Sequence, residues 1–304
     1  MVKPLVSILI PAHNAEKTIS AAIHSCLNQS YDTIEILVLD NASTDNTLGI
    51  LESFSDHQIK TFSNKEKGIA VARNFLVSKA KGKYIAWLDA DDISMPQRIE
   101  LQTAFMENYP EIDVLGSYIR VRGSESLKSV KWPIGNSALH AWLSFRNPFV
   151  QSSLMIRSSA KPSYDTAFDY VEDYHWLVQN KDTLELQILP EYLCSYYQSD
   201  EEIKCKIKQH KQEEKLFTIW GDEFKSAEHL FKFLRSNIVD KVDDPFLEIK
   251  SHFNNSEDKQ RKAILYYYML RLYKLYPNLK VLSFCFRHLV FLPRALKIRP
   301  RFVR

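Results

Sequence analysis

Short apolar runs alternate with segments of helical periodicity over the first half of this chain. Val6–Ile10 and Ile34–Leu39 are continuous apolar runs, as expected for strands that are buried on both faces. Between them, five apolar residues recur at helical spacing and share one face: Ile19, Ala22, Ile23, Cys26 and Leu27. This alternation predicts an α/β fold with a Rossmann-like, mostly parallel central sheet flanked by helices.

The same patterns predict the remaining elements. Further strands are expected at residues 58–62, 83–89, 113–122 and 151–157, with helices at about 69–79, 97–108 and 138–145. Asn14 is expected to cap the first helix, and Ser94–Gln97 reads as a capping box for another. After residue 198 the chain lacks convincing strand patterns, so we expect a helical appendage over residues 199–304 and some mixed pairing before it.

Composition excludes several classes of protein. The chain has 304 residues and only 7 glycines, and it contains neither G-x-G-x-x-G nor a Walker-type phosphate loop. Its 4 cysteines are scattered, which makes a zinc site unlikely and indicates a reducing compartment. No signal peptide and no apolar run long enough to span a bilayer are evident, so we expect a cytoplasmic protein.

The charge is divided unequally along the chain. Residues 259–304 contain twelve Lys and Arg but no Asp or Glu, whereas the preceding residues are acidic overall. This basic segment also carries apolar stretches that are too short and too charged to cross a membrane. We expect it to make a peripheral contact with anionic lipid, on the inner face of the cytoplasmic membrane. The alternatives are a helical lid that packs its aromatic residues on the domain and a surface for a protein partner.

Two carboxylates follow the predicted strand at 83–89. Asp89 and Asp91 are two residues apart, so on a strand they would share a face at its carboxyl end, while Asp92 would point away or begin the turn. Carboxylates in this position suit Mg²⁺ or Mn²⁺, which often complete their shell with substrate phosphates. A solvated acidic turn is the alternative for an isolated pair of this kind.

Three further segments precede this pair in order: Val6–Glu16, Ile36–Asp45 and Gly68–Asn74. Together with Asp89–Asp92 they resemble the inverting glycosyltransferases of family 2, which have the GT-A fold and include enzymes of bacterial surface-polysaccharide and lipooligosaccharide assembly. The resemblance covers roughly residues 3–198. It implies a GT-A domain over 1–198, with a nucleotide-sugar half at 1–110 and an acceptor half at 111–198.

The resemblance also implies a donor site. A sugar nucleotide, such as UDP-Gal, UDP-GlcNAc, UDP-GalNAc or UDP-Glc, would bind across the first four strand ends, with Asp91 and Asp89 holding Mn²⁺ or Mg²⁺. Arg73 would lie against the nucleotide or its diphosphate, although from its neighbours alone it could be a surface residue. The residues implied in donor binding are Pro11, His13, Asn14, Glu16, Asp40, Arg73, Asp89, Ala90 and Asp91.

On the acceptor side, Asn147–Arg157 resembles the strand at the floor of the acceptor site, and Val171–Leu177 resembles the family's Glu-Asp motif. The resemblance implies that Asp173 is the catalytic base and that Gln151, Glu172 and Trp176 lie on the acceptor side. Trp132, Trp142 and Trp176 are candidates for stacking on sugars, with burial in the core as the alternative for each. The acceptor would be a glycan or a lipid-linked glycan.

Two other functions remain open from the sequence. A sugar-nucleotide pyrophosphorylase has a similar sheet, but it would usually show a glycine-rich basic loop where this chain has Pro11–Asn14. A catalytically inactive scaffold that binds membrane or nucleic acid is suggested by the basic segment. Retention of Asp89, Asp91 and Asp173 argues against inactivity, and the acidic first domain argues against nucleic-acid binding.

Overall fold

The computed structural model describes residues 2–122, 128–131, 134–143, 147–197 and 301–303. The chain divides into two compact units. The first comprises residues 1–131, 149–212 and 301–304, and the second comprises 132–148 and 213–300. The boundary predicted at residue 198 and nearly all of the predicted appendage lie outside the described residues, so both remain predictions.

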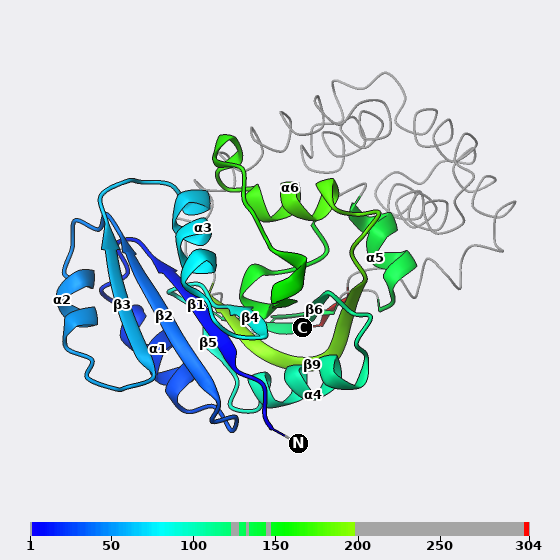
Figure 1. The fold of residues 1–304 in the computed structure, drawn as a ribbon, viewed down its shortest axis with the longest axis horizontal. Helices are drawn as coiled ribbons and strands as arrows, with labels where there is room; N and C mark the ends of the chain where they lie inside the picture. Colours follow the sequence, from blue (N-terminus) through cyan, green and yellow to red (C-terminus); the bar gives the residue numbers. More distant parts are fainter. Residues whose placement is uncertain (1, 123–127, 132–133, 144–146, 198–300, 304) are drawn as a thin grey trace, which may run out of the picture. The chain divides into compact units, whose positions relative to one another are not determined.

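Four parallel strands form the first part of the sheet, in the order β4-β1-β2-β3. They are β1 (Val6–Ala12), β2 (Ile34–Asn41), β3 (Ile59–Asn64) and β4 (Tyr84–Trp87). The connections carry α1 (Ile19–Leu27), α2 (Thr47–Glu52) and α3 (Ile69–Lys79), and Figure 1 shows these helices beside the strands. Every residue of β1 and β2 is buried, as their continuous apolar sequences predict.

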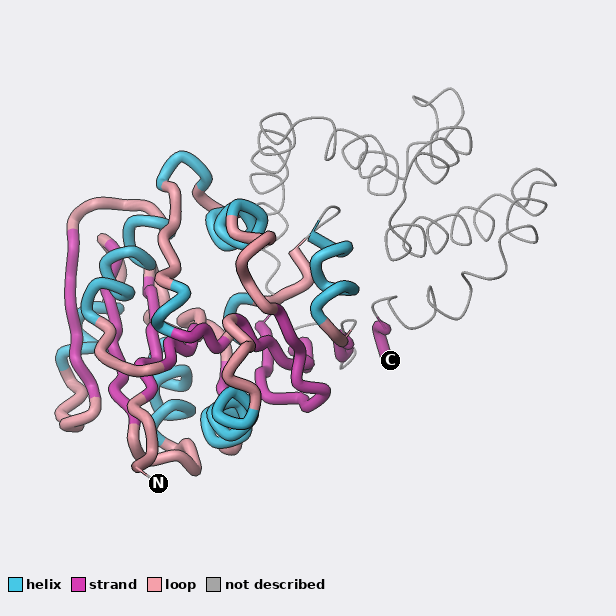
Figure 2. Tube along the Cα trace, turned by 45° about the vertical axis from the view of Figure 1, so that its right-hand side comes forward, coloured by secondary structure: helices cyan, strands magenta, loops and turns pink. Residues whose placement is uncertain are grey.

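The second part of the sheet is mixed. The short strand β8 (Met155–Arg157) lies between β4 and β6 (Val114–Arg122) and is antiparallel to both. The long strand β9 (Leu186–Tyr197) runs parallel to β6 and also pairs with the two-residue strand β5 (Ile93–Ser94). At the far edge, β7 (Lys128–Lys131) pairs with β6 and with β10 (Arg301–Val303), which is the strand beside the letter C in Figure 2.

The remaining helices belong to the second half of the described chain. They are α4 (Arg98–Asn108), α5 (Asn136–Leu143), α6 (Glu172–Gln179) and three single 3₁₀ turns: η1 (Gln151–Ser153), η2 (Ser158–Ala160) and η3 (Thr166–Phe168). None of the helices within the described ranges is long and apolar enough to cross a membrane.

The predicted α/β class with mixed pairing is confirmed, but several local predictions are wrong. Asn14 does not cap α1, because the helix begins at Ile19 and Asn14 adopts a left-handed backbone with φ 50°. Ser94 belongs to β5 rather than to a capping box, since it pairs with Cys194. Gln151–Ser153 forms η1 instead of the first half of a strand.

Candidate active site

The carboxyl ends of β1 and β2 bring several predicted donor-site residues to one edge of the sheet. Ala12 pairs with Asp40 in the parallel register, so Pro11 and Asp40 lie one residue before the ends of neighbouring strands. His13 follows β1, and its ring Nδ1 donates to the backbone oxygen of Asn41 at 2.8 Å. Convergence of these residues at one sheet edge is what the order of motifs predicts.

Hydrogen bonds join the loops that follow β1 and β2. The backbone N–H of Thr44 donates to Asn14 Oδ1 at 2.8 Å, and that of Asn46 donates to Glu16 Oε2 at 3.0 Å. In the other direction, the N–H of Asn14 donates to Ser43 Oγ at 2.9 Å. Asn14 and Glu16 therefore hold the two loops together beside the carboxyl ends of β1 and β2.

Asp40 has the chemistry of a ligand-binding residue. Its side chain is buried, and Oδ1 has no hydrogen-bond partner among the described residues. A buried carboxylate oxygen left in this way carries a desolvation cost of about 1–3 kcal/mol or more. The oxygen is therefore suited to accept an N–H from a bound heterocycle.

Asp89, Ala90, Asp91 and Asp92 form a tight turn rather than the end of a strand. Strand β4 ends at Trp87, and the N–H of Asp92 donates back to the oxygen of Asp89 at 3.1 Å. The predicted alternation of Asp89 and Asp91 on a strand face is therefore wrong. Both side chains are nevertheless partly exposed on the same turn, whereas Ala90 is buried.

Neighbouring elements fix this turn in place. The N–H of Asp89 donates to Ser152 Oγ at 2.9 Å, and Arg122 Nη2 donates to the oxygen of Asp91 at 2.6 Å. Asp92 is fully buried, and its Oδ1 accepts from the N–H of Tyr197 at 2.7 Å. Burial, together with Asp89 and Asp91, holds the pKa of Asp92 well above its usual range. The turn is thus tied to η1, β6 and β9.

Arg73 connects this turn to α6. Its guanidinium pairs with Glu172 and lies 3.5 Å from Asp89 Oδ1. It also sits 5.6 Å from the ring centre of Trp87 and 5.9 Å from that of Tyr164, in the range of cation–π contacts. Arg73 is only 5% exposed, so the surface alternative is wrong. Burial opposes the charge, but Glu172, Asp89 and Asp173 outweigh it and raise the pKa of Arg73.

Glu172 and Asp173 begin α6, where negative charge is favourable. Burial raises the pKa of Glu172 to about 7, with Arg73 opposing the rise and Asp173 adding to it. The pKa of Asp173 is raised as well, again chiefly by burial. Asp173 remains partly exposed, and its Oδ1 accepts from the N–H of Tyr174 at 2.7 Å. Glu172 and Asp173, beside one guanidinium, therefore hold protons more tightly than ordinary carboxylates.

The predicted acceptor residues differ in their surroundings. Gln151 is 6% exposed, and neither atom of its side-chain amide has a hydrogen-bond partner among the described residues. Trp176 and Trp142 are both buried, so the core alternative holds for them, and Trp132 lies outside the described residues. The Trp176 ring packs 6.3 Å from that of Tyr164, which itself lies beside Trp87.

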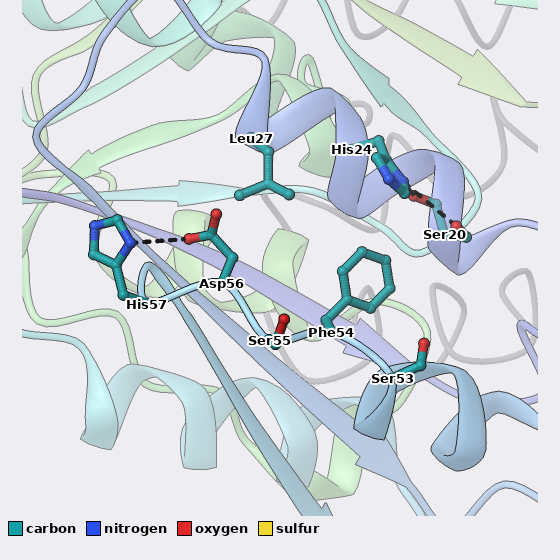
Figure 3. A pocket seen from close by; sticks show the side chains of 8 residues that line it. All are labelled: Ser20, His24, Leu27, Ser53, Phe54, Ser55, Asp56 and His57. Atoms are coloured by element: carbon teal, nitrogen blue, oxygen red, sulfur yellow. Dashed lines mark hydrogen bonds and ion pairs between the residues drawn. The ribbon is translucent and has the colours of Figure 1, made fainter.

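A surface pocket elsewhere on the domain is unrelated to this site. It is lined by Ser20, His24 and Leu27 of α1 and by residues 53–57, which follow α2 (Figure 3). In the close-up, His57 pairs with Asp56, while His24 bonds to Ser20. None of the predicted site residues lines this pocket.

Sequence reasoning missed the residues that position the site. Ser152 and Arg122 hold the Asp89–Asp92 turn, and Asn74 bonds to Tyr164 through both ends of its amide, at 2.6 and 2.8 Å. These contacts join residues far apart in the chain. The only indication in the sequence was that each neighbours a predicted site residue: Asn74 follows Arg73, and Ser152 follows Gln151.

The family model for Glycosyl transferase family 2 matches residues 7–161, and an uncharacterized glycosyltransferase of Haemophilus influenzae is 30% identical over 99% of this chain and 97% of its own length. The chain belongs to glycosyltransferase family 2. Another relative, the Escherichia coli WfgD, is named a UDP-Glc:alpha-D-GlcNAc-diphosphoundecaprenol beta-1,3-glucosyltransferase. It is 48% identical over 34% of this chain and 41% of its own length.

Solved structures share the GT-A fold of this family 2 chain. S. aureus TarS 1-349 in complex with UDP has a TM-score of 0.58 at 17% identity, covering 86% of this chain and 80% of TarS. The mannosyltransferase PcManGT from Pyrobaculum calidifontis, solved with GDP-Man and Mn²⁺, has a TM-score of 0.60 at 16% identity, covering 98% of this chain and 87% of its own. At such identities the likeness establishes the fold alone.

Proposed function

We propose that this family 2 chain transfers a sugar from a nucleotide donor to a hydroxyl group of a glycan, with inversion at the anomeric carbon. The observation that carries the proposal is the arrangement around Arg73. One buried guanidinium contacts the Asp89 turn on one side and Glu172, next to Asp173, on the other. The groups needed at the leaving diphosphate and at the acceptor hydroxyl are thereby held within one cluster.

A uridine diphosphate sugar is the proposed donor. The unpartnered Oδ1 of Asp40 would accept the N–H of a pyrimidine, beside Pro11 and His13 near the end of the neighbouring strand. The name of WfgD specifies UDP-Glc, and TarS was solved with UDP, which supports this choice. PcManGT was solved with GDP-Man, so a guanosine donor belongs in the experimental screen.

Asp91 and Asp89 fit a divalent cation such as Mn²⁺ or Mg²⁺. Both carboxylates lie partly exposed on one turn, and oxygen donors suit these ions. Within the described ranges, no group of three or more His, Cys, Asp or Glu could hold a metal. Diphosphate oxygens would therefore complete the ion's shell, and the bound ion would neutralise charge on the diphosphate.

Asp173 is the proposed base. It accepts the proton of the acceptor hydroxyl as that oxygen bonds to the anomeric carbon and the carbon–oxygen bond to the diphosphate breaks. A single displacement of this kind inverts the anomeric centre. The raised pKa of Asp173 suits the role, because a base with a pKa nearer neutrality takes a proton more readily. Arg73 keeps Glu172 and Asp89 fixed while this happens.

A lipid-linked glycan of bacterial surface polysaccharide is the proposed acceptor. Support comes from the name of WfgD, which specifies a diphosphoundecaprenol-linked GlcNAc. The basic residues 259–304 would then contact anionic lipid from the cytoplasmic side. Flotation with vesicles of anionic or neutral lipid tests this contact, and equal recovery with both vesicles, or none with either, contradicts it.

The decisive experiment is a donor-hydrolysis screen across nucleotide sugars with manganese. We expect release of nucleoside diphosphate from one donor, abolished by chelation and by Asp91→Ala. Asp173→Asn should lose transfer to an acceptor while still binding the nucleotide, and Asp182→Asn, an exposed carboxylate at another position, serves as the matched control. Full activity in both site variants would refute the site. If no donor is hydrolysed and no nucleotide binds, an inactive scaffold is favoured.

A further inference from the structure

An exposed tyrosine lies directly before the residues proposed to act on the acceptor. Tyr170 is 44% exposed and is one of few large apolar or aromatic side chains with such exposure in the described part of the chain. It sits between Phe168 and Val171, which are both buried. Asp173 follows three residues later, so the two Cα atoms are at most about 11 Å apart, roughly the reach of one or two sugar rings.

The backbone at Tyr170 is held in an unfavourable conformation. Its φ is 75°, in the left-handed region that bulky side chains rarely adopt. Such a conformation costs on the order of 1–3 kcal/mol, and it persists only where the surroundings enforce it. A residue kept exposed at this cost points to a role for its side chain rather than to a requirement of the turn.

The surrounding segment is fixed at several points. The N–H of Ala70, at the start of α3, donates to Asp169 Oδ1 at 3.2 Å. The Phe168 ring stacks on His175 of α6 with centroids 4.2 Å apart. The ring of Tyr170 is therefore carried by a segment tied to both α3 and α6, beside the candidate site.

We propose that Tyr170 is a stacking platform for a sugar ring of the acceptor. This inference rests on the proposed function, because Asp173 identifies the acceptor side. The flat apolar face of a hexose covers an aromatic ring well, and burying that ring contributes to binding. The tryptophans Trp142 and Trp176 are buried, whereas Tyr170 is exposed three residues before Asp173.

The test measures transfer from the donor found in the hydrolysis screen to a panel of methyl glycosides. Tyr170→Ala should raise the acceptor KM about tenfold, equivalent to about 1.4 kcal/mol, with donor hydrolysis unchanged. Tyr170→Phe should retain the wild-type KM because the ring remains. Tyr109→Ala, which removes another tyrosine that is 47% exposed, is the control and should have no effect.

A second variant separates binding from folding. Tyr170→Gly relieves the left-handed strain, so it should unfold at the same or a higher temperature than wild type and still raise the acceptor KM. An unchanged acceptor KM in both the Ala and Gly variants would overturn the platform, as would an equal rise in Tyr170→Phe. If the wild-type protein hydrolyses the donor and the acceptor KM of these variants is unchanged, only the platform is refuted. Failure to bind any nucleotide refutes the proposed function as well.

Discussion

At the scale of single residues, Arg73 shows how strongly this site depends on one charge. Its guanidinium is buried beside Trp87 and Tyr164, and it pairs with Glu172 and Asp89. Buried ion pairs bring little net stability when compared with well-packed apolar groups, but removing one partner is costly. The arrangement is therefore better explained by the placement of Glu172 and Asp89 than by stability.

Arg73→Ala should lower the free energy of unfolding by about 3–5 kcal/mol, because it leaves Glu172 buried without a partner. Lys83→Ala, which breaks a half-exposed pair with Glu107, is the control and should cost less than about 1 kcal/mol. Urea unfolding measures both. The double variant Arg73→Met with Glu172→Leu should recover much of the stability but no transferase activity. If Arg73→Ala lowered the free energy of unfolding no more than Lys83→Ala, the buried pair would not be what holds the site together.

Glu172 gives the fold a pH dependence of known sign. Its folded pKa of about 7 lies above the ordinary value of 4.5, so the folded chain binds the proton more tightly than the unfolded chain. The stabilisation is fully present below about pH 4.5 and is lost as the pH rises through about 7. Unfolding free energies measured across this window should fall more steeply for wild type than for Glu172→Gln. Parallel curves would contradict the raised pKa.

The places of the candidate residues on the fold could be predicted, but not the contacts that hold them. Asp40 at the end of a strand and Asp173 at the start of a helix follow visible patterns and a family resemblance, and their roles remain predictions. Ser152 and Asn74 could not, since their role depends on bonds to Asp89 and Tyr164, far away in the chain. Tyr170 was also missed, because neither its exposure nor its φ is visible in a local pattern.

At the scale of elements, helix α3 was predicted with its observed bounds, whereas β9 was not predicted at all. An apolar helical face recurs at regular spacing, which is a strong local signal. Strand β9 instead contains Pro190 and Glu191 and departs from regular register with β6 beside Tyr118. Irregular strands of this kind are defined by their partners, so their own sequence predicts them poorly.

Gly82 controls the connection into β4. A Cβ at this position would lie 2.6 Å from Ser7 N, 2.7 Å from Tyr84 O and 2.8 Å from Leu5 O, all backbone atoms. Gly82→Ala should therefore destabilise the fold by about 1–3 kcal/mol through overpacking. Gly49→Ala in α2 is the control, because the added Cβ meets only the side chain of Asn46. Denaturant unfolding measures both variants. Equal losses of unfolding free energy in Gly82→Ala and Gly49→Ala would contradict the overpacking explanation.

At the scale of the whole molecule, the chain's end returns to the sheet. Residues Arg301–Val303 pair with β7 and cover its edge, so the first compact unit is discontinuous in sequence. Ending the chain at residue 300 should lower the unfolding temperature and promote self-association, since an uncovered strand edge pairs with other chains. Thermal unfolding and light scattering measure this. A variant with alanine at residues 301–303 keeps the backbone and should remain monodisperse; equal aggregation in both would contradict the edge explanation.

The bonds between α3 and the segment before α6 bear on how such proteins can be recombined. Exchanging only residues 149–180 with those of a relative would separate Arg73 from Glu172, Asn74 from Tyr164 and Ala70 from Asp169. A hybrid with altered acceptor choice should therefore inherit α3 together with this segment from the same parent. These bonds define which segments must be exchanged together, rather than the predicted boundary between the nucleotide-sugar half at 1–110 and the acceptor half at 111–198.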